Sequence, residues 1–171
     1  MNKEDILKER AKILSKPKQQ ETIKSDFLEI LVFKIANEKY GIETKYAKEV
    51  YPLKDYTPLP GTPLYIFGLI NVRRKILAVI NLKSFFGLAE TKNENSKVII
   101  LKGGEKEFGL LTDGFEGIQK ISISKVQTSL PTLTGIRQEL FKGVTLDKII
   151  IIDGKKLFSS QEIIVDEMVE L

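Results

Sequence analysis

The sequence contains no histidine, no cysteine and no tryptophan among its 171 residues. Histidine is the commonest general base near neutral pH and the commonest protein ligand for transition metals. Cysteine is required for disulfides and for thiolate zinc sites, and the usual nucleophilic triads need one residue or the other. An enzyme that uses only carboxylates and lysines remains possible, but we expect no enzyme, no metal centre and no bound cofactor.

Long apolar runs and clustered charge are also missing. No apolar stretch approaches the roughly 20 residues that a membrane-spanning helix needs, and Met1–Asp26 carries charges throughout, unlike a secretory signal. The 27 basic residues are mostly lysines scattered among 23 acidic residues. Dispersed lysine without stacking aromatics is typical of a solvated surface. These features predict a cytoplasmic protein with no direct membrane insertion and no nucleic-acid partner.

Short apolar stretches that alternate with polar residues fill most of the chain after residue 26. Many end at polar or glycine turns such as Asn37-Glu38-Lys39 and Gly103-Gly104, which is typical of successive β-hairpins. Four prolines between Pro52 and Pro63 predict an extended connector, because proline can neither continue a helix nor pair in a central strand. The pattern predicts an all-β fold of one or two small barrels.

The longer helical patterns lie near the two ends of the chain. Within residues 1–26, apolar residues recur at helical spacing up to Pro17, which predicts an N-terminal helical extension and a polar linker. The last segment predicts a C-terminal helix with one apolar face. Either Asp153 or Ser159 is expected to cap its first turn.

The most apolar stretch, from Gly68 to Leu88, is predicted to form a strand, a basic turn, a second strand and a short helical cap. Its turn, Arg73-Arg74-Lys75, holds two of the chain's four arginines. An arginine fixed at the end of an apolar strand suits a carboxylate, because the guanidinium binds it through two parallel hydrogen bonds. The turn is therefore either an ordinary exposed turn or a binding site.

Several short motifs occur in order around this hairpin. They are Tyr40-Gly41-Ile42-Glu43, Glu49-Val50, Pro60 to Gly68, and Gly68, Asn71, Val72 and Arg73 followed by Val79 and Leu82. Over about residues 27–165 they resemble the signature of the CheW family, the coupling proteins of bacterial chemotaxis. Three residues depart from that signature: Arg74 stands in place of glycine, Ala78 in place of proline and Asn81 in place of aspartate.

The resemblance implies two SH3- or OB-like five-stranded β-barrel subdomains that share a core. Residues 1–26 are then the helical extension with its linker, and residues 27–171 are the CheW-like domain. We expect the first barrel to comprise about residues 27–89 plus the C-terminal end, and the second about residues 96–152. The polar segment Ala89–Ser96 is the expected boundary between them.

The same resemblance implies a non-enzymatic adaptor that couples chemoreceptors (methyl-accepting chemotaxis proteins) to the CheA histidine kinase. Its implied partners are the CheA regulatory domain and the cytoplasmic tip of the chemoreceptor, which would recruit the protein to membrane receptor arrays. In the family, the positions of Glu49 and Arg73 form a surface ion pair where kinase and receptor bind. Buried apolar anchors are expected between the barrels, although each is alternatively plain core. The full expected partner-binding set is Glu49, Arg73, Arg74, Val50, Gly68, Asn71, Val79, Val98 and Leu110.

Two other functions stay open. An OB-like nucleic-acid-binding module using Arg73-Arg74-Lys75 would lose affinity steeply with salt, but the aromatic platform for stacking is missing. The second open function is an enzyme that uses only carboxylates. Against it, Asp113 and Glu116 flank a glycine turn and are expected to be solvated, while Glu105 and Glu107 alternate across a hairpin and need not converge.

Overall fold

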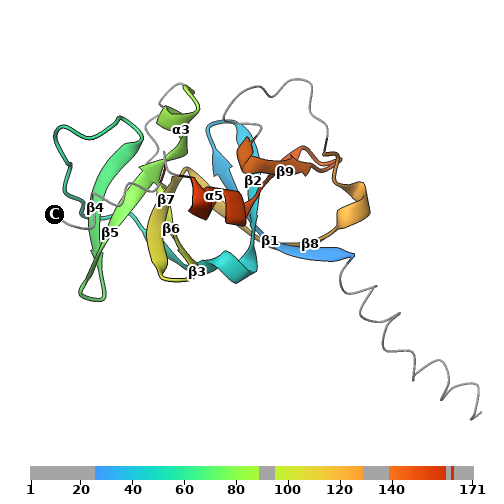
Figure 1. The fold of residues 1–171 in the computed structure, drawn as a ribbon, viewed down its shortest axis with the longest axis horizontal. Coiled ribbons are helices and arrows are strands. Elements are labelled where there is room, and N and C mark those ends of the chain that lie inside the picture. The colour runs from blue at the N-terminus through green and yellow to red at the C-terminus, as the bar shows by residue number, and fades with distance from the viewer. Residues whose placement is uncertain (1–25, 89–94, 129–138, 161–162, 164–171) are drawn as a thin grey trace, which may run out of the picture.

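A computed structural model describes residues 26–88, 95–128, 139–160 and 163. The fold of these residues is mostly β, as expected, with short helical turns between the strands (Figure 1). The strands are β1 (Phe27–Ile35), β2 (Glu38–Glu43), β3 (Ala47–Pro52), β4 (Ile66–Val72), β5 (Lys75–Asn81), β6 (Lys97–Gly103), β7 (Lys106–Thr112), β8 (Gly114–Ser122), β9 (Phe141–Val144) and β10 (Ile149–Ile152). The short helices are η1 (Thr44–Tyr46), α3 (Leu82–Phe85), η2 (Ile123–Lys125) and α5 (Gly154–Ser159).

The strands form two five-stranded sheets, each curled into a barrel. Barrel A has the strand order β8-β1-β2-β10-β9, and barrel B has the order β3-β6-β7-β5-β4. The edges of each sheet are brought together by one isolated bridge. Gln127, beyond β8, pairs with Val144 on β9, and Thr57, beyond β3, pairs with Leu69 on β4. The expected pair of five-stranded barrels is therefore confirmed.

The expected division of strands between the barrels is wrong. Strands β3, β4 and β5, which were placed in the first barrel, belong with β6 and β7 in barrel B. Barrel A instead combines β1 and β2 with β8, β9 and β10. The polar segment Ala89–Ser96 consequently connects two strands of the same barrel and is not a boundary. Hairpin signals are local, whereas barrel membership is set by distant pairings such as the parallel pair β2–β10.

The two barrels repeat one plan. Barrel B uses β3 to β7 in chain order, and barrel A uses β8, β9, β10, β1 and β2 in the equivalent places. Each contains one parallel pair, β5–β7 in barrel B and β2–β10 in barrel A. Each also has a glycine under its closing bridge. A Cβ on Gly68 would lie 2.6 Å from the Thr57 carbonyl oxygen, and one on Gly143 would lie 2.3 Å from that of Gln127. Only glycine lets the backbones approach this closely.

Buried side chains form one shared core and two smaller ones. The shared core takes residues from both sheets, including Phe33 and Tyr40 of barrel A and Ile80 and Leu110 of barrel B. A second cluster, around Val79, lies among barrel B strands, and a third cluster belongs to β1 and β10 of barrel A. The expected sharing of a core is thus present. It makes the barrels one cooperative unit, because neither buries its apolar face alone.

A buried ion pair also ties the barrels together. Lys83 Nζ, on α3 after barrel B's hairpin, lies 2.5 Å from Asp113 Oδ1, and both side chains are less than a tenth exposed. The other oxygen of Asp113 accepts from the Ala36 backbone N–H, in the β1–β2 turn of barrel A, at 2.6 Å. Asp113 was expected to be a solvated turn carboxylate, and that prediction is wrong. Its neighbour in the prediction, Glu116, is paired at the surface with Lys34 and Lys39.

The helical predictions have different outcomes. Asp153 caps α5, since its side chain accepts from the Lys156 backbone N–H at 3.3 Å, which settles the choice between Asp153 and Ser159. The N-terminal helical extension and the C-terminal part of the last helix lie outside the described residues. No helix in the described part of the chain is long and apolar enough to cross a membrane.

Candidate functional site

The β4–β5 hairpin forms as the alternation of its residues predicts. Val72 pairs with Lys75, which leaves Arg73 and Arg74 as a two-residue turn. Both arginines have positive φ, 51° for Arg73 and 66° for Arg74. A two-residue turn of this handedness matches the twist of the strands, but it favours asparagine and glycine. Each arginine held in this region costs about 1–2 kcal/mol relative to an ordinary conformation.

The first arginine of the turn is paired, as predicted. Arg73 Nη2 lies 3.0 Å from Glu49 Oε2 on β3, and the Arg73 side chain is 78% exposed while that of Glu49 is 23% exposed. The Glu49 backbone is set by a bulge, because the β3–β6 register shifts between Ala47 and Glu49. The pair holds the guanidinium over one end of barrel B, with much of its hydrogen-bonding fork open to a partner.

Beside this pair lies a carboxylate that binds two lysines. Glu107, on β7, has a side chain only 7% exposed and lies 2.8 Å from Lys75 Nζ and 3.0 Å from Lys48 Nζ. The hydrogen bond from Lys75 lowers the pKa of Glu107, burial opposes this, and Lys48 lowers it further, so the pKa lies below its ordinary value. The alternation of Glu105 and Glu107 gave no sign of this cluster, because the lysines come from β3 and β5.

Arg74, the second arginine of the turn, is exposed, and no ion pair joins it to any residue in the described ranges. Its neighbours Arg73 and Lys75 are both engaged by acids of the same barrel. The turn therefore presents one guanidinium that the described part of the chain does not neutralise. Figure 1 shows the hairpin at the end of the molecule opposite β8 and β9.

The outer face of the hairpin carries apolar surface next to the turn. Ile76 is 69% exposed and lies across from exposed Asn71, and Leu69 and Ala78 form the next, half-buried pair. An exposed isoleucine beside arginines is a mixed apolar and basic surface. Such surfaces are more typical of protein interfaces than of nucleic-acid interfaces, where charge and stacking aromatics dominate.

The remaining predicted site residues divide into core and surface. Val79, Val98 and Leu110 have none of their surface exposed, so as core residues they do not contact a partner directly, which corrects the expectation of apolar anchors there. Val50 is half-buried against the shared core. Gly68 lies under the closing bridge of barrel B, so the structure gives it a packing reason instead of a surface one.

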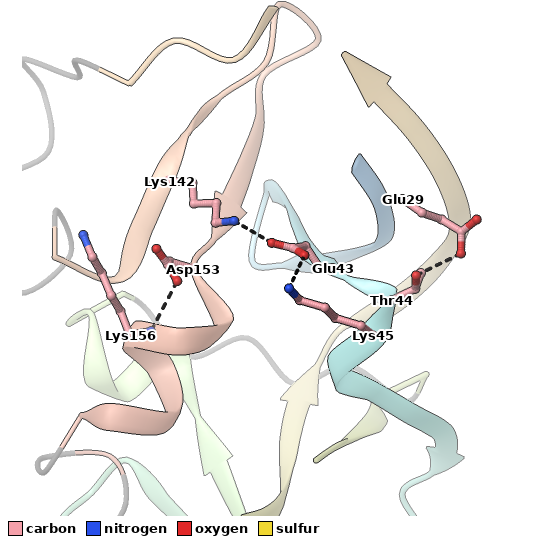
Figure 2. A network of polar contacts seen from close by, with 7 residues as sticks. All are labelled: Glu29, Glu43, Thr44, Lys45, Lys142, Asp153 and Lys156. Atoms are coloured by element: carbon pink, nitrogen blue, oxygen red, sulfur yellow. Dashed lines mark hydrogen bonds and ion pairs between the residues drawn. The ribbon is translucent and has the colours of Figure 1, made fainter. Parts of the chain in front are cut away.

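A second charged centre, in barrel A, was not predicted as such. The Glu43 side chain, at the end of β2, is 10% exposed and lies 2.5 Å from Lys142 Nζ and 3.2 Å from Lys45 Nζ (Figure 2). Burial raises the pKa of Glu43, but the hydrogen bonds from Lys142 and Lys45 outweigh it and leave the pKa below its ordinary value. Nearby, the Thr44 hydroxyl donates to Glu29 at 2.9 Å. The centre links the end of β2 to β9 through the Glu43–Lys142 pair.

None of these clusters has the composition of a metal site. Within the described ranges, no three acidic side chains gather where they would hold a metal ion. The acids near the hairpin each face basic side chains of the same barrel, as Glu49 faces Arg73 and Glu107 faces Lys75. The arrangement at the hairpin presents a fixed, partly paired basic turn with an apolar flank.

Known proteins share this architecture. The family model described as "CheW-like domain" matches residues 29–162. The chain is 30% identical over 149 residues to the chemotaxis protein CheW of Treponema pallidum, covering 82% of this chain and 88% of that one. It is 28% identical to CheW of Klebsiella aerogenes, covering 78% and 83%.

A solved structure agrees with these relatives. The scaffolding protein TtCheW from Thermoanaerobacter tengcongensis superposes with a TM-score of 0.67 at 34% identity, covering 74% of this chain and 84% of that one. The matched range, 29–162, includes strands of both barrels and the β4–β5 hairpin. The chain therefore belongs to the CheW family.

Proposed function

We propose that this protein is a non-enzymatic adaptor that couples the cytoplasmic tip of a chemoreceptor to the regulatory domain of the CheA histidine kinase. Membership of the CheW family supports this, as do the names of its relatives, which are chemotaxis and scaffolding proteins. The single observation that carries the proposal is the Arg73–Glu49 pair, preformed at 3.0 Å on an exposed turn.

The geometry favours docking over chemistry. The hairpin is tied to the neighbouring strand β7, because Lys75 is paired with Glu107, so Arg73 is presented without a large loss of freedom on binding. Arg73 keeps hydrogen-bonding capacity beyond its bond to Glu49, and a guanidinium suits a partner carboxylate or carbonyl. Signals would then pass through changes in these contacts. Recruitment to receptor arrays at the membrane follows from the receptor contact alone.

The test is calorimetric titration of the protein with the cognate CheA regulatory domain and, separately, with a receptor-tip fragment. Arg73→Glu and Glu49→Arg are compared with Lys120→Glu, which makes a charge reversal of the same size on the exposed face of β8 in barrel A. We expect both reversals of the Arg73–Glu49 pair to weaken binding and the control to leave it unchanged. Absence of binding by the wild-type chain to either partner would overturn the adaptor function.

A further inference from the structure

We propose that Arg74 determines partner choice, and that its guanidinium binds a carboxylate on the regulatory domain of the cognate CheA kinase. This inference rests on the adaptor function proposed above and deepens it by naming the contact. Arg74 is the second residue of the two-residue turn between β4 and β5, and its backbone has a positive φ of 66°.

The two basic neighbours of Arg74 in the turn are paired with acids, whereas within the described ranges Arg74 is not. Arg73 is paired with Glu49 at 3.0 Å and Lys75 with Glu107 at 2.8 Å. Arg74 lies between them and has no ion pair in the part of the chain that the structure describes. Two of three adjacent positive charges are thus compensated within barrel B, and the third, at the apex, is available to another molecule.

The backbone of Arg74 has a conformation that is unfavourable for arginine. Arg74 has a φ of 66°, a conformation that glycine adopts at no steric cost and arginine does not. Arginine therefore makes the turn less stable than glycine would, and Arg74 makes no described ion pair that would compensate. Residues held in such conformations cluster at functional sites, where the surrounding structure maintains them. A binding role for the side chain accounts for an arginine at a position whose backbone conformation favours glycine.

The surface around Arg74 favours a protein partner over a nucleic acid. Ile76, one position beyond Lys75, is 69% exposed on the outer face of the hairpin, and the carboxylates of Glu49 and Glu107 are already paired with Arg73 and Lys75. A phosphate backbone would gain nothing from the isoleucine. A protein surface with one carboxylate beside an apolar side chain would match both Arg74 and Ile76.

The turn lies at the end of barrel B, away from barrel A (Figure 1). A compact regulatory domain can therefore approach Arg74 without contacting barrel A. We assign the kinase domain to Arg74, and titration with the receptor tip tests the other partner of the adaptor.

The experiment compares Arg74→Gly, Arg74→Lys and Arg74→Glu by calorimetric titration with the kinase regulatory domain. Losing a charge-assisted hydrogen bond should raise Kd roughly tenfold or more in Arg74→Gly. Arg74→Glu should bind more weakly still, and Arg74→Lys should lie between wild type and glycine, because lysine keeps the charge but not the fork. Lys120→Glu is the control and should bind like wild type. The melting temperature of Arg74→Gly should equal or exceed that of wild type, so weaker binding cannot come from misfolding.

A charge-swap arm tests the contact itself. Exposed acidic residues of the regulatory domain are changed singly to lysine, and one of these variants should bind Arg74→Glu more tightly than the wild-type domain does. If no variant does so, the direct contact is overturned. The contact is equally overturned if Arg74→Gly binds as well as wild type, or weakens only toward the receptor tip. The adaptor function fails separately, when the wild-type chain binds neither partner.

Discussion

Arg73 and Glu49 join the tip of the β4–β5 hairpin to β3, with 3.0 Å between Nη2 and Oε2, although β3 and β4 are the outermost strands of barrel B's sheet. The pair therefore lies across the opening of the curled sheet. The same two edges are also linked by the backbone bridge between Thr57 and Leu69. An exposed ion pair and a backbone bridge thus act in parallel, and they differ in what they contribute to stability.

The ion pair should matter little for folding. Arg73→Ala is expected to change the free energy of unfolding by less than about 1 kcal/mol, because exposed ion pairs are screened by water and cost side-chain freedom. Urea unfolding followed by circular dichroism measures this. A loss of several kcal/mol would mean that the pair closes the barrel, and that binding defects of Arg73 variants report misfolding.

The glycines under the closing bridges should matter much more. Gly68→Ala and Gly143→Ala place a Cβ 2.6 and 2.3 Å from the carbonyl oxygens of Thr57 and Gln127. We expect each to lower the free energy of unfolding by about 1–3 kcal/mol through overpacking. Gly114→Ala, with open space around its Cβ, is the matched control and should be near neutral. Equal unfolding midpoints for all three variants would show that the bridges open without cost.

The buried ion pair between the barrels gives a sharper test. Asp113→Ala leaves the Lys83 ammonium buried without this carboxylate and removes the acceptor of the Ala36 N–H. Removing one member of a buried pair costs about 3–5 kcal/mol. The double variant Lys83→Met and Asp113→Ala should regain part of that loss, because the buried ammonium is removed together with the carboxylate. A double variant that is less stable than Asp113→Ala alone would contradict this account, and chemical denaturation distinguishes the two.

Glu43 should make the protein sensitive to acid. Its pKa in the folded state lies below the ordinary value of 4.5, so its contribution to stability is full above that value and is lost as the pH falls through the lowered pKa. Glu43→Gln should therefore lose stability near pH 7 and show a shallower decline than wild type below about pH 4.5. Unfolding free energies measured from pH 7 to pH 3 test this. Parallel curves for the two proteins would contradict it.

Sequence patterns were sufficient for the hairpins but not for their assembly. The basic turn, the strands on either side of it and the Arg73–Glu49 pair were predicted, because alternation is local and the motif supplied the partner. The assignment of β3, β4 and β5 to a barrel failed, since nothing in a strand's own residues says which distant strand it will pair with.

Buried carboxylates escaped prediction for the same reason. Asp113 and Glu107 look like polar turn and hairpin residues, and their lysines, Lys83 and Lys48, come from other elements. The signal that would have found them is the presence of lysine within otherwise apolar surroundings, as at Lys83 after the β5 strand. From the sequence alone, however, the acidic residue that pairs with such a lysine cannot be identified.

The repeated plan of the two barrels has a consequence for how the chain folds while it is being made. The ribosome releases the strands in order, and barrel B has all its strands once Thr112 has emerged. Barrel A begins with β1 and β2 yet needs β10, which ends at Ile152. Strands β1 and β2 therefore lack part of their own barrel until nearly the whole described chain is synthesised, and the earlier apolar neighbours of Phe33 and Tyr40 are the barrel B residues of the shared core. The strands of the half that carries the basic turn are thus released first, and its shared core is filled only when the other half follows.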